Sequence, residues 1–317
     1  MIGVLGLGSI GLRHARNALA LGREVMGCDP SPERRALLAA EGGRVTADRA
    51  DLLGSVNGVV IATPSDRHED DLAAAIAAGC HALVEKPIGH RVGCLPEILA
   101  EAEAQAVTVA AALNLRLHPA VSRAKAVLDE GGLGTPLWAA FTAALYLPDW
   151  RPGQDWRQGY ANDPRTGGAI FDYIHEFDLA CHLLGEAEAL ACAARCSGTL
   201  GLESEDMADA ILRHADGCHS TIHVDYVTRP RLRVFQISGT GGRIEADLDR
   251  RTFRHLDPTG AIVEDLSFPG SYGDDYITEM EAFLACMGGA EPVCGGAEAL
   301  AVLRTVLSAR SLAGLPS

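Results

Sequence analysis

The spacing of hydrophobic residues along this chain changes about a third of the way from its start. In the first third, short apolar runs alternate with segments whose apolar residues recur every three or four positions. These two patterns are typical of buried strands and amphipathic helices. They predict strands at 2–5, 24–28, 58–63, 82–85 and 107–113, and helices at 66–79 and 95–105. Such alternation favours a parallel sheet with helices on both faces.

Beyond residue 113 the pattern indicates a different kind of domain. One helix at 118–130 precedes a strand near 137–145, and further strands are expected at 207–214, 218–227, 232–239 and 243–247. Successive strands without intervening helices imply an antiparallel sheet. Two helices, at about 275–287 and 297–312, end the chain. With 317 residues, the chain can bury two cores, and we predict two domains, 1–117 and 118–317.

A glycine-rich turn follows the first strand and leads into a helical pattern. In a dinucleotide site, Gly6 would allow the tight turn, Gly8 would let backbone N–H groups approach a pyrophosphate, and Gly11 would permit close packing of helix on strand. The start of the helix favours an anion. We therefore predict a cofactor site here, which also includes Ser9 and Ile10.

Asp29 ends the second strand, about twenty residues beyond the glycines, where a carboxylate can accept hydrogen bonds from adenosine ribose hydroxyls. This position predicts NAD as the preferred cofactor. NADP stays open, because Arg34 could approach a ribose phosphate. A second interpretation is that Asp29 only caps the next helix, since Asp-Pro-Ser-Pro-Glu is typical of a turn before a helix.

Two further segments fall at the carboxyl ends of predicted strands, where ligands bind in open parallel sheets. They are Thr63-Pro64-Ser65 and Glu85-Lys86-Pro87. Their position predicts that Lys86 lies at the cofactor crevice, although a lysine before a proline could also belong to a surface turn.

The composition excludes several classes of function. The net charge of −15 opposes binding to nucleic acid or to anionic membranes. No apolar stretch reaches the length of a membrane span and no signal peptide is recognised, so the cytoplasm is the expected location. The nine scattered cysteines are expected to be reduced and mostly buried. We predict no metal site, and we expect His214, His219 and His223 at solvent-facing or cross-strand positions.

Several of these segments together resemble the glucose-fructose oxidoreductase, inositol dehydrogenase and rhizopine-catabolism family, called the Gfo/Idh/MocA family. The resemblance covers nearly the whole chain. It rests on the glycine turn, Ala62-Thr63-Pro64 with His68, Glu85-Lys86-Pro87, Asn114-Leu115-Arg116, and Gly167-Gly168 leading to Asp172, His175 and Asp178. It implies a Rossmann domain followed by an α/β domain with an open, mainly antiparallel sheet, and a cis peptide before Pro87.

The resemblance implicates Lys86 and His175 at the reacting carbon, and the chemistry agrees. Hydride transfer from a secondary alcohol needs a base for the hydroxyl proton, and a neutral imidazole suits that role. A lysine beside the same oxygen would stabilise alkoxide character. Asp172 would orient His175 or bind a substrate hydroxyl. It precedes His175 by three residues rather than the commoner four, and on one helix either spacing leaves the side chains close.

Other residues complete the predicted site. Thr63, Pro64, His68, Glu85 and Asn114 join the cofactor site. The expected substrate residues, besides His175, are Arg116, Trp150, Trp156 and Arg157, since aromatic faces and guanidinium groups suit sugars and their acidic derivatives. Packing is the alternative role for the tryptophans and for His175. His68 is expected to be exposed in the first turn of its helix, and the acids Asp172 and Asp178 could instead interact with a helix dipole.

The sequence thus predicts an NAD(P)-dependent oxidoreductase acting on a secondary hydroxyl or keto group of a sugar, cyclitol or nucleotide sugar. One alternative is a dinucleotide-binding sensor or regulatory protein, against which the presence of both Lys86 and His175 argues. Another is a C=C or C=N reductase of the dihydrodiol or biliverdin type. The open face of the antiparallel sheet is expected to form a homo-oligomer, a dimer or tetramer.

Overall fold

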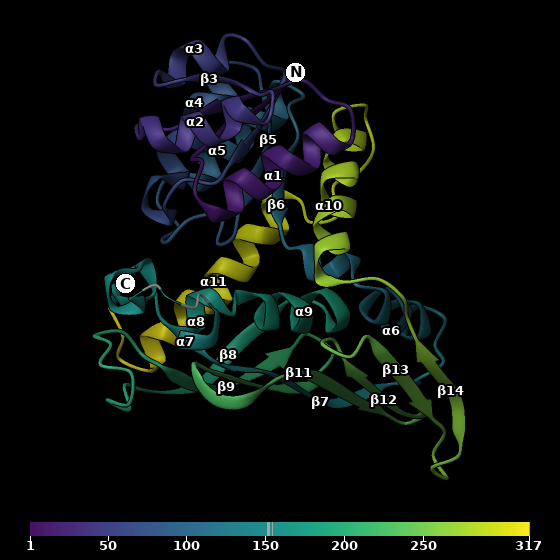
Figure 1. Ribbon diagram of the computed structural model, residues 1–317. Helices are drawn as coiled ribbons and strands as arrows, with labels where there is room; N and C mark the ends of the chain where they lie inside the picture. Colours follow the sequence, from purple (N-terminus) through teal and green to yellow (C-terminus); the bar gives the residue numbers. More distant parts are fainter. Residues whose placement is uncertain (151–152, 154, 317) are drawn as a thin grey trace. The chain divides into compact units, whose positions relative to one another are not determined.

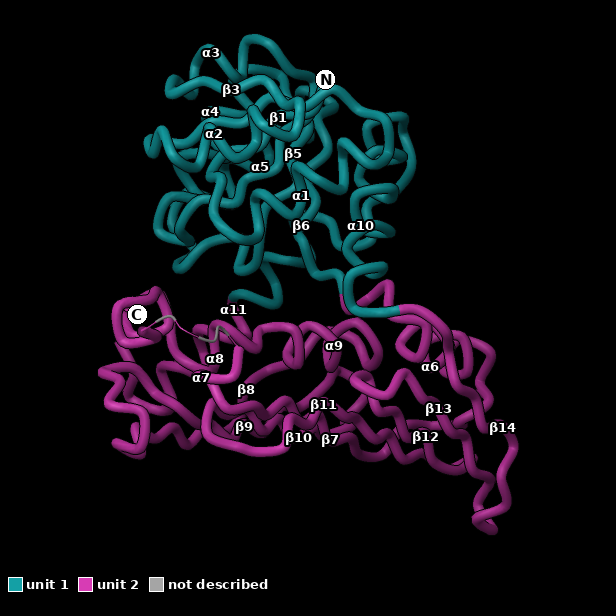
Figure 2. Tube along the Cα trace, in the orientation of Figure 1, with its two compact units in different colours: residues 1–114, 271–303 teal, residues 115–270, 304–317 magenta. Residues whose placement is uncertain are grey.

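The computed structural model describes every residue except 151, 152, 154 and 317. The chain forms two compact units, shown in Figure 2: residues 1–114 with 271–303, and residues 115–270 with 304–317. The predicted boundary at 117 lies three residues beyond the observed change at 114. Residues 271–303, predicted to belong to the second domain, instead complete the first unit.

The first unit contains a six-stranded parallel sheet, as predicted (Figure 1). Its strand order is β3-β2-β1-β4-β5-β6, so the order reverses between β1 and β4. The strands are β1 (Ile2–Leu5), β2 (Val25–Cys28), β3 (Arg44–Thr46), β4 (Gly58–Ile61), β5 (His81–Glu85) and β6 (Val109–Ala112). Ligands of such sheets bind outside the carboxyl ends of the strands at this reversal.

Helices of the first unit bury their apolar residues against this sheet and against one another. They are α1 (Ser9–Ala20), α2 (Pro32–Ala40), α3 (Arg49–Leu53), α4 (His68–Ala77), α5 (Leu95–Ala104), α10 (Tyr272–Cys286) and the start of α11 (Gly296–Leu312). Met280 and Phe283 of α10 share one core with Val4 of β1 and with Leu12 and Ala15 of α1. This shared core is why residues 271–303 belong to the first unit. The amphipathic pattern of α10 predicted the helix but could not name its partner.

The second unit contains an eight-stranded sheet of order β14-β13-β12-β11-β7-β10-β9-β8. Every neighbouring pair is antiparallel except β7 and β10, which are parallel. The sheet is therefore mainly antiparallel, as the family resemblance implied. The strands are β7 (Pro136–Tyr146), β8 (Ala187–Arg195), β9 (Met207–His214), β10 (His219–Asp225), β11 (Val227–Gly239), β12 (Gly242–Asp247), β13 (Thr252–Leu256) and β14 (Ile262–Ser267).

One face of this sheet is covered by helices of the same unit (Figure 1). They are α6 (Pro119–Asp129), α7 (Leu147–Trp150), α8 (Ala169–Asp172), α9 (Ile174–Leu184) and the end of α11. Residues along β9 alternate between buried and exposed, which is the pattern of a sheet with one solvated face. Phe141 and Phe235 stack within the buried layer, with ring centroids 5.7 Å apart. Trp138 and Ile211 are exposed.

Candidate functional site

The glycine turn after β1 has the geometry that a dinucleotide site needs. Gly6 adopts φ +85°, and a Cβ there would lie 2.6 Å from the carbonyl oxygen of Ala62. A Cβ on Gly11 would lie 1.8 Å from the carbonyl oxygen of Gly6, so this position brings α1 close against the turn. A Cβ on Gly8 would meet nothing within 4 Å. The space beside Gly8 is thus open, as the approach of a pyrophosphate requires.

Asp29, directly after β2, connects the glycine turn to the start of α2. It is 2% exposed. Its Oδ2 accepts a hydrogen bond from the Leu7 backbone N–H at 2.8 Å, and its Oδ1 accepts one from the Ser31 N–H at 2.8 Å. The interpretation of Asp29 as the helix cap is wrong, because Ser31 is the N-cap of α2 and accepts from the Arg34 N–H. Each carboxylate oxygen keeps capacity for another donor.

The Arg34 guanidinium lies 3.5 Å from Asp29 Oδ2. A cation therefore lies beside the carboxylate that is predicted to bind the ribose hydroxyls. NADP as the alternative cofactor depends on this arginine, and the position of Arg34 beside Asp29 is compatible with that alternative.

Glu85 is the last residue of β5 and lies under the backbone of Lys86. It accepts a hydrogen bond from the Lys86 N–H at 3.1 Å, and its Oε1 lies 2.8 Å from Nε2 of His14 on α1. Burial opposes the charged carboxylate, but the hydrogen bond from His14 and the charges of His14 and Lys86 outweigh it and lower the pKa of Glu85. Sequence reasoning missed His14. Its signal was a histidine on the otherwise apolar face of α1.

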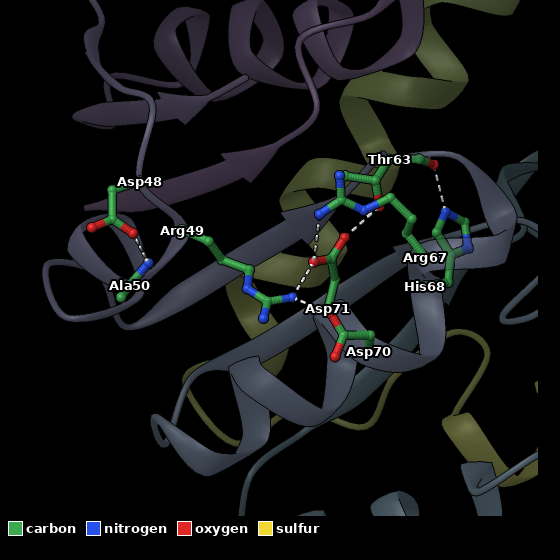
Figure 3. Close-up of polar contacts among 8 residues, drawn as sticks. All are labelled: Asp48, Arg49, Ala50, Thr63, Arg67, His68, Asp70 and Asp71. Carbon is green, nitrogen blue, oxygen red and sulfur yellow. Dashed lines mark hydrogen bonds and ion pairs between the residues drawn. The ribbon is translucent and has the colours of Figure 1, made fainter. Parts of the chain in front are cut away.

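The residues predicted at the end of β4 are linked by polar contacts (Figure 3). The Thr63 hydroxyl donates to Asp71 Oδ2 at 2.7 Å, and Arg49 donates to Asp71 Oδ1 at 2.7 Å. Pro64 precedes the short helix η1 (Ser65–Arg67). The expectation that His68 is exposed is wrong. Its side chain is buried, with one ring nitrogen 2.8 Å from the carbonyl oxygen of Thr63 and the other 2.8 Å from that of Pro87.

Asn114 follows β6, which pairs with β5 so that Ala112 lies opposite Glu85. The side chain of Asn114 is buried, and neither atom of its amide has a hydrogen-bond partner among the described residues. A buried amide without a partner is costly and calls for an explanation. Together with the open space at Gly8, it fits a polar cofactor bound along this edge of the sheet.

In the second unit, Asp172 and His175 lie on different helices. Asp172 ends α8, Tyr173 has non-helical backbone angles (φ −98°, ψ 31°), and α9 begins at Ile174. The expected single helix through both residues is therefore wrong. Asp172 accepts hydrogen bonds from the hydroxyls of Tyr160 at 2.7 Å and Tyr226 at 2.5 Å.

Neither tyrosine was predicted, since one follows the irregular stretch and the other lies in the β10–β11 connection. Tyr226 is fully buried, whereas Tyr160 is 47% exposed. Asp172 and His175 are both buried. Asp172 and His175 thus lie inside the second unit. Tyr160, which donates to Asp172, reaches the surface.

Arg116 does not present a free guanidinium to a substrate. It donates to both oxygens of Asp178, with the shortest distance 2.7 Å, and both side chains are almost completely buried. Glu176, next to the predicted histidine, is paired in the same way with Arg233 at 2.7 Å. These two ion pairs anchor α9, so we assign Arg116 and Asp178 a structural role.

The predicted substrate residues Trp150, Trp156 and Arg157 have different surroundings. Trp150, at the end of α7, is 42% exposed. Trp156 donates from Nε1 to the carbonyl oxygen of Leu200 at 3.0 Å, and the Arg157 guanidinium lies over its ring at 5.4 Å. Arg157 also donates to Asp155 at 2.8 Å. The Leu200 carbonyl therefore holds Trp156, whereas Asp155 and the Trp156 ring hold Arg157.

The remaining histidines and cysteines have structural surroundings. His214 is buried between the Gly185 carbonyl and the Ser220 hydroxyl, at 2.8 and 2.9 Å, and its contact with Ser220 joins β9 to β10, so it holds the cross-strand one of the two expected positions. His223 lies between Asp209 and Asp225. None of the nine cysteines forms a disulfide, and five of them are buried. No group of three potential metal ligands occurs among the described residues, and no helix there is long and apolar enough to cross a bilayer.

Two family models match the chain. The first, described as the oxidoreductase family with an NAD-binding Rossmann fold, matches residues 1–113. The second, described as the GFO/IDH/MocA C-terminal domain, matches residues 121–245.

Known proteins match three quarters or more of the chain. A 1,5-anhydro-D-fructose reductase of Ensifer adhaerens is 29% identical over 76% of this chain and 74% of its own. An inositol 2-dehydrogenase of Rhizobium meliloti is 28% identical over 95% of this chain and 93% of its own. A protein of gentamicin A biosynthesis, solved in complex with NAD, is 26% identical, covers 99% of this chain and 93% of its own, and superposes with a TM-score of 0.84.

Proposed function

The chain belongs to the Gfo/Idh/MocA family of NAD-binding oxidoreductases, and from that premise we propose that it oxidises or reduces one carbon of a sugar-like substrate. The reaction interconverts a secondary hydroxyl and a keto group. The observation that carries the proposal is the arrangement of Gly8, Lys86 and Asn114. All three follow strands of one parallel sheet, at the edge where such sheets bind ligands.

The cofactor proposal rests on the first unit alone. Gly6, Gly8, Ser9, Ile10 and Gly11 would hold the pyrophosphate at the start of α1. Asp29 would hold the adenosine ribose, with Thr63, Pro64, Glu85 and Asn114 along the same sheet edge. When bound, the nicotinamide supplies the acceptor or donor of hydride.

Lys86 and His175 are proposed to act on the substrate oxygen. His175 would take the hydroxyl proton during oxidation and return it during reduction. The Lys86 ammonium would stabilise negative charge that develops on that oxygen. Asp172, held by Tyr160 and Tyr226, would provide a fixed carboxylate near the start of α9 that orients His175 or binds a substrate hydroxyl.

The substrate class is proposed from the relatives. The proteins matched include an anhydrofructose reductase and inositol dehydrogenases, whose names share a polyhydroxylated ring. Trp150, Trp156 and Arg157 would line the substrate side, because aromatic faces and a guanidinium bind sugars and their acidic derivatives. Arg116 is left out of this proposal because Asp178 already engages its guanidinium.

The assembly and compartment are proposed on separate grounds. The solvated face of the eight-stranded sheet carries Trp138 and Ile211 among polar residues, and we propose that it forms a homo-oligomer. Nine cysteines without a disulfide suit a reducing compartment such as the cytoplasm. The net charge of −15 makes nucleic acid and anionic membranes poor partners.

A cofactor-coupled screen tests the proposed activity. The full chain is incubated with NAD+ or NADP+ and a panel of inositols, aldoses and nucleotide sugars, and reduced nicotinamide is followed by absorbance. We expect turnover with NAD+ and at least one polyol. Binding of NADH without turnover of any panel member would instead favour the sensor, and activity on C=C or C=N substrates alone would favour the second alternative.

Two variants then test the assigned residues on the substrate found. Lys86→Ala should abolish turnover while leaving NADH affinity within about threefold of wild type. His175→Ala should lower the rate and remove the acidic limb of the pH profile. Near-normal turnover of Lys86→Ala would reject the mechanism, and an unchanged acidic limb would reject the base role.

A further inference from the structure

His68 joins the two strand-end segments of the first unit through backbone atoms. Its Nε2 lies 2.8 Å from the Thr63 carbonyl oxygen, after β4, and its Nδ1 lies 2.8 Å from the Pro87 carbonyl oxygen, after β5. Figure 3 shows the ring beside Thr63 at the start of α4. The side chain is only 1% exposed. One buried ring therefore spans the two loops that border the predicted cofactor crevice.

The two contacts cannot be equivalent when the ring is neutral. A neutral imidazole carries one N–H, so it can donate to one carbonyl at a time. Burial lowers the pKa of His68, although the two carbonyls and the charges of Glu85 and Asp71 oppose the shift. The ring is accordingly neutral near pH 7, and the choice of tautomer decides which loop it holds.

The contact with Pro87 bears on function because that loop carries Lys86. The Thr63 side is already fixed, because the Thr63 hydroxyl donates to the buried Asp71, which Arg49 also contacts. On the Lys86 side, Glu85 accepts from the Lys86 N–H, and the Pro87 nitrogen has no hydrogen to donate. The Pro87 carbonyl is therefore a remaining point at which the backbone after Lys86 can be anchored.

We propose that His68 is a positioning residue for Lys86, which it fixes by donating from Nδ1 to the Pro87 carbonyl. This role replaces the predicted direct contact of His68 with the cofactor. The proposal rests on the proposed function in one respect only, namely that Lys86 is the residue whose position matters for turnover.

Two substitutions separate the two ring nitrogens. The side-chain amide nitrogen of asparagine lies about where Nδ1 of histidine does, and that of glutamine lies about where Nε2 does. His68→Asn therefore keeps a donor for the Pro87 carbonyl, whereas His68→Gln keeps one for Thr63. Both variants replace the same buried imidazole ring with an amide side chain, so each serves as the stability control for the other.

The main measurement needs no substrate. The chain has only two lysines, Lys86 and Lys125, so reductive methylation with ¹³C-formaldehyde gives two lysine signals in an NMR spectrum, and Lys125→Arg assigns them. We expect the Lys86 signal of His68→Asn to match wild type with and without NADH. In His68→Gln the same signal should shift and lose its response to NADH. Equal changes in both variants, or a change in His68→Asn alone, would overturn the proposal.

Kinetics give a second measurement once the screen has identified a substrate. His68→Gln should lower kcat by tenfold to about a hundredfold, the loss expected from misplacing a reacting group by about 1 Å. His68→Asn should stay within threefold, and neither variant should change NADH affinity by more than threefold. A loss of NADH affinity in both would return His68 to the cofactor site.

The wild-type chain tests the tautomer even if both variants fail to fold. The ¹⁵N shifts of the His68 ring distinguish a protonated Nδ1 from a protonated Nε2. Protonation at Nδ1 supports the proposal, and protonation at Nε2 overturns it. Failure of the whole functional proposal would appear differently, as an absence of turnover with an intact Lys86 signal.

Discussion

Replacing Gly8 by alanine should separate cofactor binding from folding. Gly8 is the N-cap of α1, with φ −68° and ψ −170°, a conformation that alanine adopts freely. The added methyl group would meet no protein atom within 4 Å. It would, however, occupy the space through which a pyrophosphate must approach the backbone N–H groups of the turn.

The expected magnitudes follow from these contacts. Alanine is a poorer N-cap than glycine, which destabilises the folded state by up to about 1 kcal/mol. Alanine also restricts the unfolded chain more than glycine does, which stabilises the folded state by about 0.4–1 kcal/mol. Stability should therefore change by less than about 1 kcal/mol. Loss of one or two hydrogen bonds to a charged phosphate costs about 1.5–3 kcal/mol each, which corresponds to a weakening of NADH binding by about tenfold or more.

The assay is a fluorescence titration with NADH beside a thermal unfolding scan of the same preparation. Gly11→Ala is the matched control, because its methyl group would lie 1.8 Å from the Gly6 carbonyl oxygen and should cost about 1–3 kcal/mol in stability. If Gly8→Ala bound NADH within threefold of wild type, the glycine turn would not be the pyrophosphate site.

Three further changes have defined outcomes. Asp29→Ala removes the acceptor of two backbone N–H groups and should lower the NAD to NADP preference about tenfold, measured as a ratio of kcat/KM values; an unchanged ratio would remove Asp29 from cofactor selection. Asp178→Asn removes the negative charge of the carboxylate that Arg116 contacts and should cost about 3–5 kcal/mol in urea unfolding, whereas a loss below 1 kcal/mol would contradict a structural pair. Hydrogen bonds to Asp225 and Asp209 raise the pKa of His223 to about 9, so its stabilising contribution is full below about pH 6.5 and is lost as pH rises through 9. His223→Gln should flatten the fall of Tm over that interval, and an equally steep fall would show that other groups cause it.

The parts of the fold that sequence predicted are those that depend on neighbouring residues. The run from Ile2 to Leu5, followed by Gly6 and Gly8, contains its own strand and turn, and β1 has the predicted bounds. The missed features depend on distant residues. Nothing near His68 in the sequence indicates that the Pro87 carbonyl lies beside it, and nothing near Asp172 indicates Tyr226.

Local patterns also failed where tertiary contacts override helix periodicity. The stretch from Gly168 to Leu184 looks like one helix, but Tyr173 interrupts it. Glu176 and Asp178 then face buried arginines rather than solvent. The site was predictable as a set of residue types at strand and helix ends, whereas the partners that fix each side chain were not.

The return of residues 271–303 to the first unit has a consequence for synthesis. Most of the second unit, residues 115–270, is inserted in the sequence between two parts of the first, and Met280 and Phe283 belong to the core that also contains β1 and α1. As the chain leaves the ribosome, residues 1–114 must wait for some 170 further residues before that core can close. During this interval residues 115–270 can begin to fold, although residues 304–317 of the second unit follow last. The apolar side of α1 meanwhile stays uncovered and is a natural target for chaperones.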